Sequence, residues 1–464
     1  MNSVVQQRTA RSLVTWYRIL ATGFAIASMG CFESDRPSIL LVSVDTLRAD
    51  HLGVYGFDAD TSPNLDAFAS KSVVFERGLA ASSRTAPSHA SIMTSLWVRE
   101  HSVGPINGAT RLAKDERTLA ARFREAGWET AAFISNFMLD RRLGMNVGFD
   151  VYDDELIRSE SNRDWVMERY ADETTSLALD WLDRDREDPF FLWVHYNDPH
   201  GPYQPPPPHD AVVLARHDSD EPALPVLDNQ LGLNGIPAYQ RIEGLSMPSE
   251  YHQRYAGEIQ AFDASLAELL SGAERTAAPG GLVVLITADH GESLGERNIY
   301  FAHGHGTMPE LAHVPFLLRA PGLEPGRRDE LVHHVDILPT LLDIAGLPIP
   351  ETARGIPLAR SIQSDSRLPA RTLFVDVGSE VSAYRGNQIL RAHPGAAVGD
   401  VVEGSRDEFR WAVDGALVDD EVAADLHPTL DEYMRLKPPM LRARRVSPER
   451  KAHLRALGYL HPEK

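Results

Sequence analysis

The sequence predicts an α/β protein whose core is a doubly wound, mainly parallel sheet with helices on both faces. The first observation is that residues 38–44 and 282–286 are continuous apolar runs, a pattern typical of parallel strands buried on both faces. The second is alternation, because candidate strands at 38–44, 129–134, 190–196 and 282–286 are separated by candidate helices at 118–126, 176–183 and 253–270. The third is the length of 464 residues, which accommodates one large α/β domain and a smaller appended region.

The chain starts with a segment typical of exported proteins. Arg8, Arg11 and Arg18 precede an apolar run over 19–29, and a basic stretch followed by so short a run predicts a secretory signal peptide. The run is too short for a comfortable membrane span. We therefore expect residues 1–31 to be a signal peptide and the protein to be exported to the periplasm or the cell envelope.

Cys31 is the only cysteine of the chain, and it stands where a bacterial lipoprotein would be cleaved and acylated. Residues 27–31 resemble a lipobox, although Ser28 occupies the position where leucine is usual. We expect a lipid anchor at Cys31 and a tether over 32–37. An ordinary cleaved signal and an uncleaved anchor are the alternatives. A lone cysteine also excludes an intramolecular disulfide, so stability must come from the core.

Polar side chains follow the first and the last of the predicted strands. Asp45 follows the strand at 38–44, and Asp289 and His290 follow the strand at 282–286. Because ligands gather at the carboxyl ends of strands in open α/β sheets, we expect these three side chains to converge on one divalent cation. A mixed carboxylate and imidazole set suits zinc, manganese and calcium, and the spacing does not choose among them.

A threonine stands at the predicted start of a helix between those two strands. Pro87 marks the first helical turn, and Thr85 lies just before it. Anions bind at helix N-termini, and a hydroxyl that faces a metal there is arranged for nucleophilic attack on an anionic ester. Thr85 is therefore a candidate nucleophile, whereas in isolation a helix N-cap would explain the same residue.

Two regions depart from the alternating pattern. Residues 201–249 contain four consecutive prolines at 205–208 and few periodic apolar positions, which predicts a long loop. This loop follows His200 directly, so it would form a wall of a substrate cleft or a solvated insertion. From about residue 366 the chain is less regular, with short candidate strands at 373–377 and 388–390.

Net charge argues against one class of partner. The formal charge is −20, and no basic patch offsets it. Such a surface repels nucleic acid, so we expect no nucleic-acid partner. An anionic substrate would have to be held by the metal and by local cations.

Seven segments carry polar residues in a fixed order between residues 37 and 460. They are 44–53 (VDTLRADHLG), 61–66 (TSPNLD), 85–91 (TAPSHAS), 190–200 (FFLWVHYNDPH), 287–293 (TADHGES), 335–343 (VDILPTLLD) and 454–459 (LRALGY). Together they resemble the sulfatase branch of the alkaline phosphatase superfamily. The resemblance implies an alkaline-phosphatase-like catalytic domain over 38–365 and a small C-terminal α+β subdomain over 366–464.

The resemblance also implies roles for several residues. Asp45, Asp289 and His290 match the positions of metal ligands. His200 matches the family histidine that contacts the transferred group or the leaving oxygen, and it would act as general acid. His303 stands where sulfatases have a lysine or histidine that touches the ester oxygens; His305 is the competing choice.

Four positions depart from the sulfatase pattern. Thr46 replaces the second of two consecutive acids, so it would contribute a hydroxyl to the metal at most. His89 replaces an arginine beside the nucleophile, where an imidazole provides only part of the fixed fork of a guanidinium. The segment at 133–136 lacks the family lysine, and Ser135 and Asn136 would donate hydrogen bonds to the ester instead.

The fourth departure concerns the nucleophile itself. Sulfatases carry a cysteine or serine at the position of Thr85, and it is oxidised to formylglycine. Threonine lacks the primary group that this modification needs. Nucleotide pyrophosphatases and some lipid-linked phosphotransferases of the same superfamily use threonine directly, which favours phosphoester chemistry through a covalent phosphothreonine.

The sequence therefore predicts a metal-dependent, sulfatase-family hydrolase that cleaves a sulfate or phosphate ester or diester through Thr85. The substrate would be an anionic small molecule, lipid or glycan ester, and the membrane would be reached through the lipid anchor. One alternative is an envelope phosphotransferase that modifies a lipid or glycan, although such enzymes usually carry several membrane spans. The other is a non-catalytic binding lipoprotein on a sulfatase fold.

Overall fold

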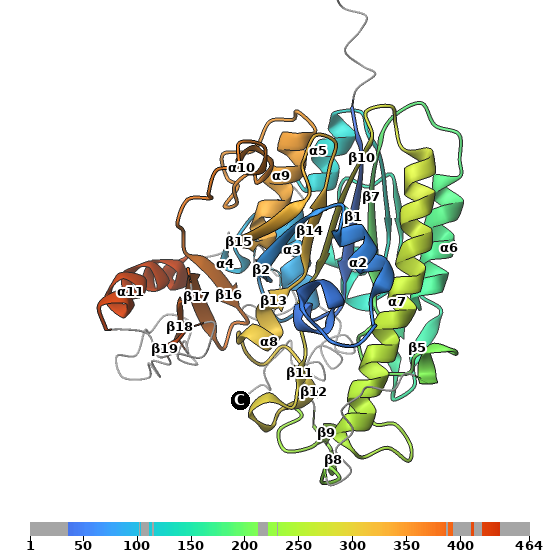
Figure 1. Ribbon diagram of the computed structural model, residues 1–464, viewed down its shortest axis with the longest axis vertical. Coiled ribbons are helices and arrows are strands. Elements are labelled where there is room, and N and C mark those ends of the chain that lie inside the picture. The colour runs from blue at the N-terminus through green and yellow to red at the C-terminus, as the bar shows by residue number, and fades with distance from the viewer. Residues whose placement is uncertain are drawn as a thin grey trace, which may run out of the picture.

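A nine-stranded mixed sheet forms the centre of the protein (Figure 1). The computed structural model describes residues 36–101, 103, 111–113, 116–211, 221–229, 231–386, 388–392, 410–412 and 420–436. The strand order is β13-β2-β14-β10-β1-β7-β3-β4, and β15 also pairs with β2. Neighbours from β10 to β4 are parallel, whereas β14 and β13 run antiparallel to their partners. The bounds are β13 His313–Val314, β2 Val73–Leu79, β14 Phe316–Arg319, β10 Leu282–Ala288, β1 Ser38–Val44, β7 Phe190–Tyr196, β3 Glu129–Phe133, β4 Val151–Asp153 and β15 Gly326–His333.

Helices cover both faces of this sheet, which confirms the predicted fold class. Strand β1 is buried throughout, and its alternate residues enter two different cores: Leu40 and Val42 pack on one face, and Ile39 and Leu41 on the other. The first core includes α2 (Pro63–Ala69), α6 (Ala171–Leu182) and α7 (Pro248–Thr276). The second includes α3 (Thr85–Thr94), α5 (Leu119–Glu125) and α9 (Ile337–Ile344). Burying each such aliphatic side chain contributes about 1.5–3 kcal/mol.

The predicted elements recur in the structure with small shifts of their ends. Strands β1 and β7 coincide with the predicted ranges, and β10 continues two residues further, to Ala288. The helix predicted at 253–270 is longer, because Pro248 opens it at the first helical turn. Strand β2 has no predicted counterpart, since Glu76 and Arg77 interrupt its apolar run.

A separate four-stranded antiparallel sheet follows the central domain. Its strands are β16 (Leu373–Asp376), β17 (Val381–Arg385), β18 (Gln388–Ala392) and β19 (Arg410–Ala412), and α11 (Asp420–Arg435) packs on it. The Tyr433 ring of α11 stacks on Phe374 at 4.1 Å. This is the predicted α+β subdomain. Its predicted boundaries at 365 and 464 stay a prediction, and residues 454–459 lie outside the described residues.

Short elements make up most of the remaining described chain. Within 201–247, the described residues form no element longer than three residues, yet Tyr203, Ile236 and Tyr239 are buried. Residues 248–249 already belong to α7. The short elements are α4 Val98–His101, α8 Pro309–Ala312, α10 Ala359–Gln363, β5 Arg158–Glu160, β6 Arg163–Glu168, β8 Val226–Leu227, β9 Ile236–Pro237, β11 Ser293–Leu294, β12 Tyr300–Ala302, η1 Ala49–His51, η2 Gly53–Tyr55, η4 Phe137–Leu139, η5 Arg141–Leu143, η6 His209–Ala211, η7 Ala238–Gln240, η8 Glu296–Asn298 and η9 His334–Asp336.

In the described part of the chain, no helix has both the length and the apolar character that a membrane crossing requires. The predicted signal peptide, the tether over 32–35 and Cys31 lie outside the described residues.

Candidate active site

The site forms at the carboxyl ends of β1 and β10. These strands are parallel neighbours, and Val44 pairs in register with Ala288. The next residues, Asp45 and Asp289, therefore emerge side by side, and the Asp289 amide donates to the Val44 carbonyl at 3.0 Å. His290 follows, and all three polar side chains are fully buried. The strand register thus brings together residues that are more than two hundred positions apart.

The three side chains present their free atoms to one point. His290 Nε2 lies 3.7 Å from Asp45 Oδ1 and 3.6 Å from Asp289 Oδ2. None of these three atoms has a hydrogen-bond partner within the described part of the chain. Two ligands bound to one zinc ion at the tetrahedral angle lie about 3.4 Å apart, so the observed separations fit a common ion.

Electrostatics and hydrogen bonding support the same arrangement. Burial, together with the neighbouring Asp289 carboxylate, raises the pKa of Asp45 well above its usual range, and burial raises the pKa of Asp289 likewise. A cation would relieve this cost. His290 Nδ1 donates to the Gly291 carbonyl at 2.9 Å, which leaves the lone pair of Nε2 available.

Thr46 stands beside these ligands in a strained backbone conformation. Its φ is 55°, in the left-handed region, which costs about 1–2 kcal/mol for a residue with a Cβ. Its amide donates to Asp289 Oδ1 at 3.3 Å, and its carbonyl accepts from Tyr255 at 2.7 Å. Its buried hydroxyl has no partner in the described residues. The contribution of this hydroxyl to a metal stays a prediction.

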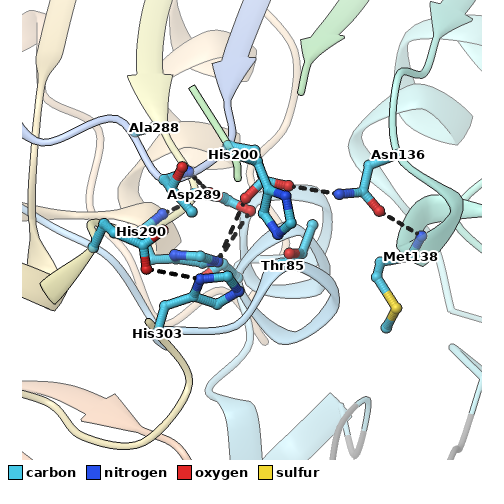
Figure 2. Close-up of polar contacts among 12 residues, drawn as sticks. Thr85, Asn136, Met138, His200, Ala288, Asp289, His290 and His303 are labelled. Atoms are coloured by element: carbon cyan, nitrogen blue, oxygen red, sulfur yellow. Dashed lines mark hydrogen bonds and ion pairs between the residues drawn. The ribbon is translucent and has the colours of Figure 1, made fainter. Parts of the chain in front are cut away.

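Thr85 opens α3 as expected from the sequence. It is 2% exposed, and its side chain is close enough to the Asp289 carboxylate to oppose the rise in the pKa of that group. Pro87 lies in the first turn, and no side chain caps the free amides of that turn at the N-cap residue Arg84. Figure 2 shows Thr85 in the same small region as Asp289 and His200. A hydroxyl, unsatisfied helix amides and candidate metal ligands therefore meet at one place.

Two histidines from later loops complete the group. The rings of His200 and His303 lie 5.2 Å apart, and the His303 ring lies 4.7 Å from His290. Burial lowers the pKa of His200 well below its usual range, with the His303 ring adding to the effect. Burial, helped by the guanidiniums of Arg163 and Arg84, lowers the pKa of His303 to about 3. Both imidazoles are therefore neutral near pH 7 in the free protein.

His305, the competing choice, points to another partner. Its Nε2 lies 3.3 Å from the hydroxyl of Ser293. His303 instead stacks among the site histidines, and its Nδ1 lies 3.0 Å from Glu292 Oε1. Glu292 Oε2 in turn accepts from the Tyr203 hydroxyl at 3.1 Å. The geometry places His303 in the site and leaves His305 at its edge.

Asn136 is a candidate ligand or a residue that supports one, and Ser135 a candidate donor to the ester; in the structure both side chains bind protein groups instead of facing an ester. Both amide hydrogens of Asn136 are used, because Nδ2 donates to Asp45 Oδ2 at 2.9 Å and to Asn197 Oδ1 at 2.8 Å. The Ser135 hydroxyl donates to the His195 carbonyl at 2.5 Å. Asn136 therefore orients the candidate metal ligand Asp45. Ser135 stabilises the backbone of β7 at His195.

His89 also acts through its neighbours. Its Nδ1 must donate, at 2.8 Å, to the Thr85 carbonyl, since that oxygen only accepts. Its Nε2 then accepts, at 2.9 Å, from the hydroxyl of Ser43. Burial lowers the pKa of His89 to about 4, so it carries no charge near pH 7. His89 holds the backbone of the candidate nucleophile, which agrees with a role outside direct substrate contact.

Sequence reasoning missed two residues of this region. Glu292 lies in the segment at 287–293, and the sequence alone gives it no role. His195 was quoted within the strand at 190–196, yet it lies fully buried 3.8 Å from Asp45 Oδ2. The available signal was a histidine within an otherwise apolar strand, one residue before its end.

Comparisons with known proteins agree with this geometry. The family model described as Sulfatase matches residues 37–347, more than half of the chain. An arylsulfatase of Clostridium perfringens is 27% identical over 385 residues, which cover 71% of this chain and 79% of that protein. A choline-sulfatase of Rhizobium meliloti is 27% identical over 365 residues, covering 68% and 69% of the two chains.

Solved structures show the same fold. The phosphonate monoester hydrolase of Agrobacterium radiobacter superposes with a TM-score of 0.64 at 19% identity, over 86% of this chain and 95% of that chain. A protein solved with its substrate D-glucosamine-2-N,6-O-disulfate gives a TM-score of 0.67 at 17% identity, over 86% and 97%.

Proposed function

Since the chain belongs to the sulfatase family, whose members hydrolyse ester bonds, we propose that it is a metal-dependent hydrolase that cleaves a phosphate ester or diester through Thr85. The observation that carries the proposal is the position of Thr85. It begins α3, and its side chain acts on the pKa of Asp289, a member of the candidate metal cluster. A sulfate ester is the alternative substrate of the same site.

The residues that would hold the metal fit a divalent ion. Asp45, Asp289 and His290 each direct one unpartnered, buried atom to a common point, and the Thr46 hydroxyl lies beside them. Zinc, manganese and calcium remain the candidates. When bound, such an ion supplies Lewis acidity to the ester oxygens and favours the alkoxide form of the nucleophile.

The chain's own groups account for the first chemical step. Thr85 Oγ1 forms a bond to phosphorus while the bond from phosphorus to the leaving oxygen breaks. The proton of this hydroxyl passes to the nearby carboxylate of Asp289, whose pKa already responds to the Thr85 side chain. The amides of the first turn of α3 bind the anionic group. The product of this step is a phosphothreonine.

His303 and its partner Glu292 supply a proton to the leaving oxygen. Burial raises the pKa of Glu292 to about 8, so its carboxyl holds a proton near pH 7 and donates to His303 Nδ1. The hydrogen of His303 then stands on Nε2, where it serves as donor. The neutral imidazole of His200 hydrogen-bonds the ester in this scheme, which differs from its expected role as general acid.

Two observations favour phosphorus over sulfur. Thr85 lacks the primary group from which sulfatases make formylglycine. His89 is neutral and bound to the Thr85 carbonyl, so the charge that an arginine would direct at the ester is missing. The cations that affect the pKa of His303 are the half-buried Arg84 and Arg163, and fewer fixed charges suit a diester.

The test compares Thr85→Val with Thr94→Val, a buried threonine of the same helix. Valine preserves the shape and removes the hydroxyl, which in Thr94 donates to the Ala90 carbonyl at 2.6 Å and accepts from the Leu96 amide at 3.3 Å. We would measure turnover of p-nitrophenyl phosphate, its diester and the sulfate, with zinc, manganese and calcium in turn. Thr85→Val should lose at least about a thousandfold in kcat, consistent with losing a covalent nucleophile. Thr94→Val should retain activity.

Several outcomes would redirect the proposal. Sulfate turnover that survives Thr85→Val would exclude Thr85 as the nucleophile. Product transfer to added alcohols in preference to water would indicate a phosphotransferase. Tight binding of an ion without turnover of any ester would favour the binding lipoprotein.

We also propose that the protein is exported and anchored to the cell envelope through a lipid on Cys31, where lipid or glycan esters are accessible. The support is the basic and apolar leader and the cysteine that ends it. Metabolic labelling with a fatty acid should mark the wild type and not Cys31→Ala. Equal labelling of both would contradict the anchor.

A further inference from the structure

His195 is a buried histidine without any hydrogen bond from its ring. It lies one residue before the end of β7, in register with Ser43 of β1, so it faces the same edge of the sheet as Asp45. Its side chain is fully buried, and neither Nδ1 nor Nε2 has a partner in the part of the chain that the structure describes. A buried ring with two bare nitrogens is costly unless something binds it.

The nearest polar groups around His195 are the two aspartates of the first cluster. Its Nε2 lies 3.8 Å from Asp45 Oδ2, the oxygen that does not face His290. A nitrogen of His195 and an oxygen of Asp289 also lie within 4.8 Å of each other. Asp45 therefore presents one oxygen to each of two imidazoles, and Asp289 belongs to both groups.

His89 completes this second group by position but is already satisfied. One of its nitrogens lies within 4.8 Å of the same atoms of His195 and Asp289. However, Nδ1 donates to the Thr85 carbonyl and Nε2 accepts from Ser43. Binding a cation through His89 would break one of these bonds. The unpartnered atoms nearest this second point are therefore the two ring nitrogens of His195 and Asp289 Oδ2. Asp45 Oδ2 accepts one hydrogen bond from Asn136 and keeps a second lone pair for a cation.

Charge balance gives a second reason for a further cation. The two aspartates neutralise one divalent ion, and a phosphate or sulfate ester then adds negative charge. In this chain neutral His89 stands where the sulfatase resemblance places an arginine. Ser135 stands where the resemblance places a lysine. A second divalent ion would supply the missing positive charge in the buried layer behind the nucleophile.

We propose that His195, Asp45 and Asp289 bind a second divalent cation, with the two carboxylates shared between this site and the Asp45–Asp289–His290 site. The proposal rests on the first ion of the proposed function, and it makes the centre dinuclear. The separation of 3.8 Å between His195 Nε2 and Asp45 Oδ2 suits two ligands of one ion, since bonds of about 2.1 Å allow up to about 4.2 Å.

Metal stoichiometry tests the proposal without reference to activity. The full chain, kept in mild detergent, would be stripped with a chelator, reloaded with Mn²⁺, dialysed and analysed for manganese per chain. The wild type should hold two ions and His195→Ala one. His252→Ala is the matched control, because this half-buried ring bonds only the Leu294 carbonyl, at 2.6 Å; it should hold two.

Electron paramagnetic resonance provides an independent reading. Two Mn²⁺ ions that share carboxylates should give a magnetically coupled spectrum in the wild type and an isolated-ion spectrum in His195→Ala. If circular dichroism shows that His195→Ala is unfolded, His195→Gln replaces it. The number of manganese ions per wild-type chain and the magnetic coupling between them then still test the proposal. One uncoupled ion in the wild type, with a water at His195, would overturn the proposal. So would two ions in a folded His195 variant.

These readings separate the two proposals. Loss of all ester turnover in every metal form, with two coupled ions in the wild type, would reject the catalytic function and keep the dinuclear site. Turnover that depends on Thr85, with one ion per chain, would keep the catalytic function and reject the dinuclear site.

Discussion

Asn136 joins the candidate metal site to the chain around it, so its removal should weaken both metal binding and folding. Nδ2 donates to Asp45 and Asn197, and Oδ1 accepts from the Met138 amide at 2.9 Å as the N-cap of η4. The residue is 4% exposed. Figure 2 shows it beside the site, with its contact to Met138 as a dashed line.

The size of the effect follows from the contacts that Asn136→Ala removes. Three buried groups lose a partner, and each costs roughly 1–3 kcal/mol, so we expect a loss of roughly 3–9 kcal/mol in the free energy of unfolding. Asp45 also loses the donor that orients its carboxylate. Removing such a partner of a metal ligand typically weakens affinity by roughly 10–100-fold.

Two measurements check this expectation. Urea unfolding of the metal-free protein gives the change in stability, and titration calorimetry with Mn²⁺ gives the affinity. Asn162→Ala is the matched control, because its amide donates to two backbone carbonyls, of Tyr239 and Arg241, on an exposed turn. It should leave the affinity unchanged. Wild-type affinity in a folded Asn136→Ala would refute the reasoning that Asn136 orients Asp45.

Two further predictions concern buried charges. Burial, with nearby acids, raises the pKa of Glu168 to about 8 from 4.5. The folded state therefore holds the proton more tightly, so this carboxyl contributes stability below pH 4.5 that is lost as the pH rises through about 8. Wild type should lose roughly 2.5 kcal/mol more than Glu168→Gln between pH 6 and pH 9; equal urea midpoint shifts for both proteins would contradict this. Arg371→Met should destabilise by roughly 3–5 kcal/mol, because it leaves the buried carboxylate of Asp336, now bound by two guanidinium contacts of 2.5 Å, without its cation. Thermal and urea unfolding measure the loss of stability. Adding Asp336→Asn to the Arg371→Met variant should recover part of that loss. An Arg371→Met stability within about 1 kcal/mol of wild type would exclude a net contribution from the pair.

Much of the parallel half of the sheet was predictable because its strands are buried on both faces. The strand at 190–196 consists largely of apolar residues, and its ends coincide with β7. The antiparallel half was not predictable in the same way. Strand β2 contains Glu76 and Arg77, which lie at partly buried positions, and nothing local indicates that β13, β14 and β15 all pair with it.

The sequence by itself determined which groups are present at the site and roughly where they stand. Asp45 and Asp289 follow apolar strands, and Thr85 begins a helix, because strand ends and helix starts are local properties of the chain.

Only the tertiary structure decided how these groups contact one another. The register between β1 and β7 places His195 beside Asp45, and the loop after β7 turns Asn197 toward Asn136. These contacts join residues 61 to 150 positions apart. They depend on strand pairing and on which buried donor finds which acceptor, and neither is encoded in any local pattern of residues.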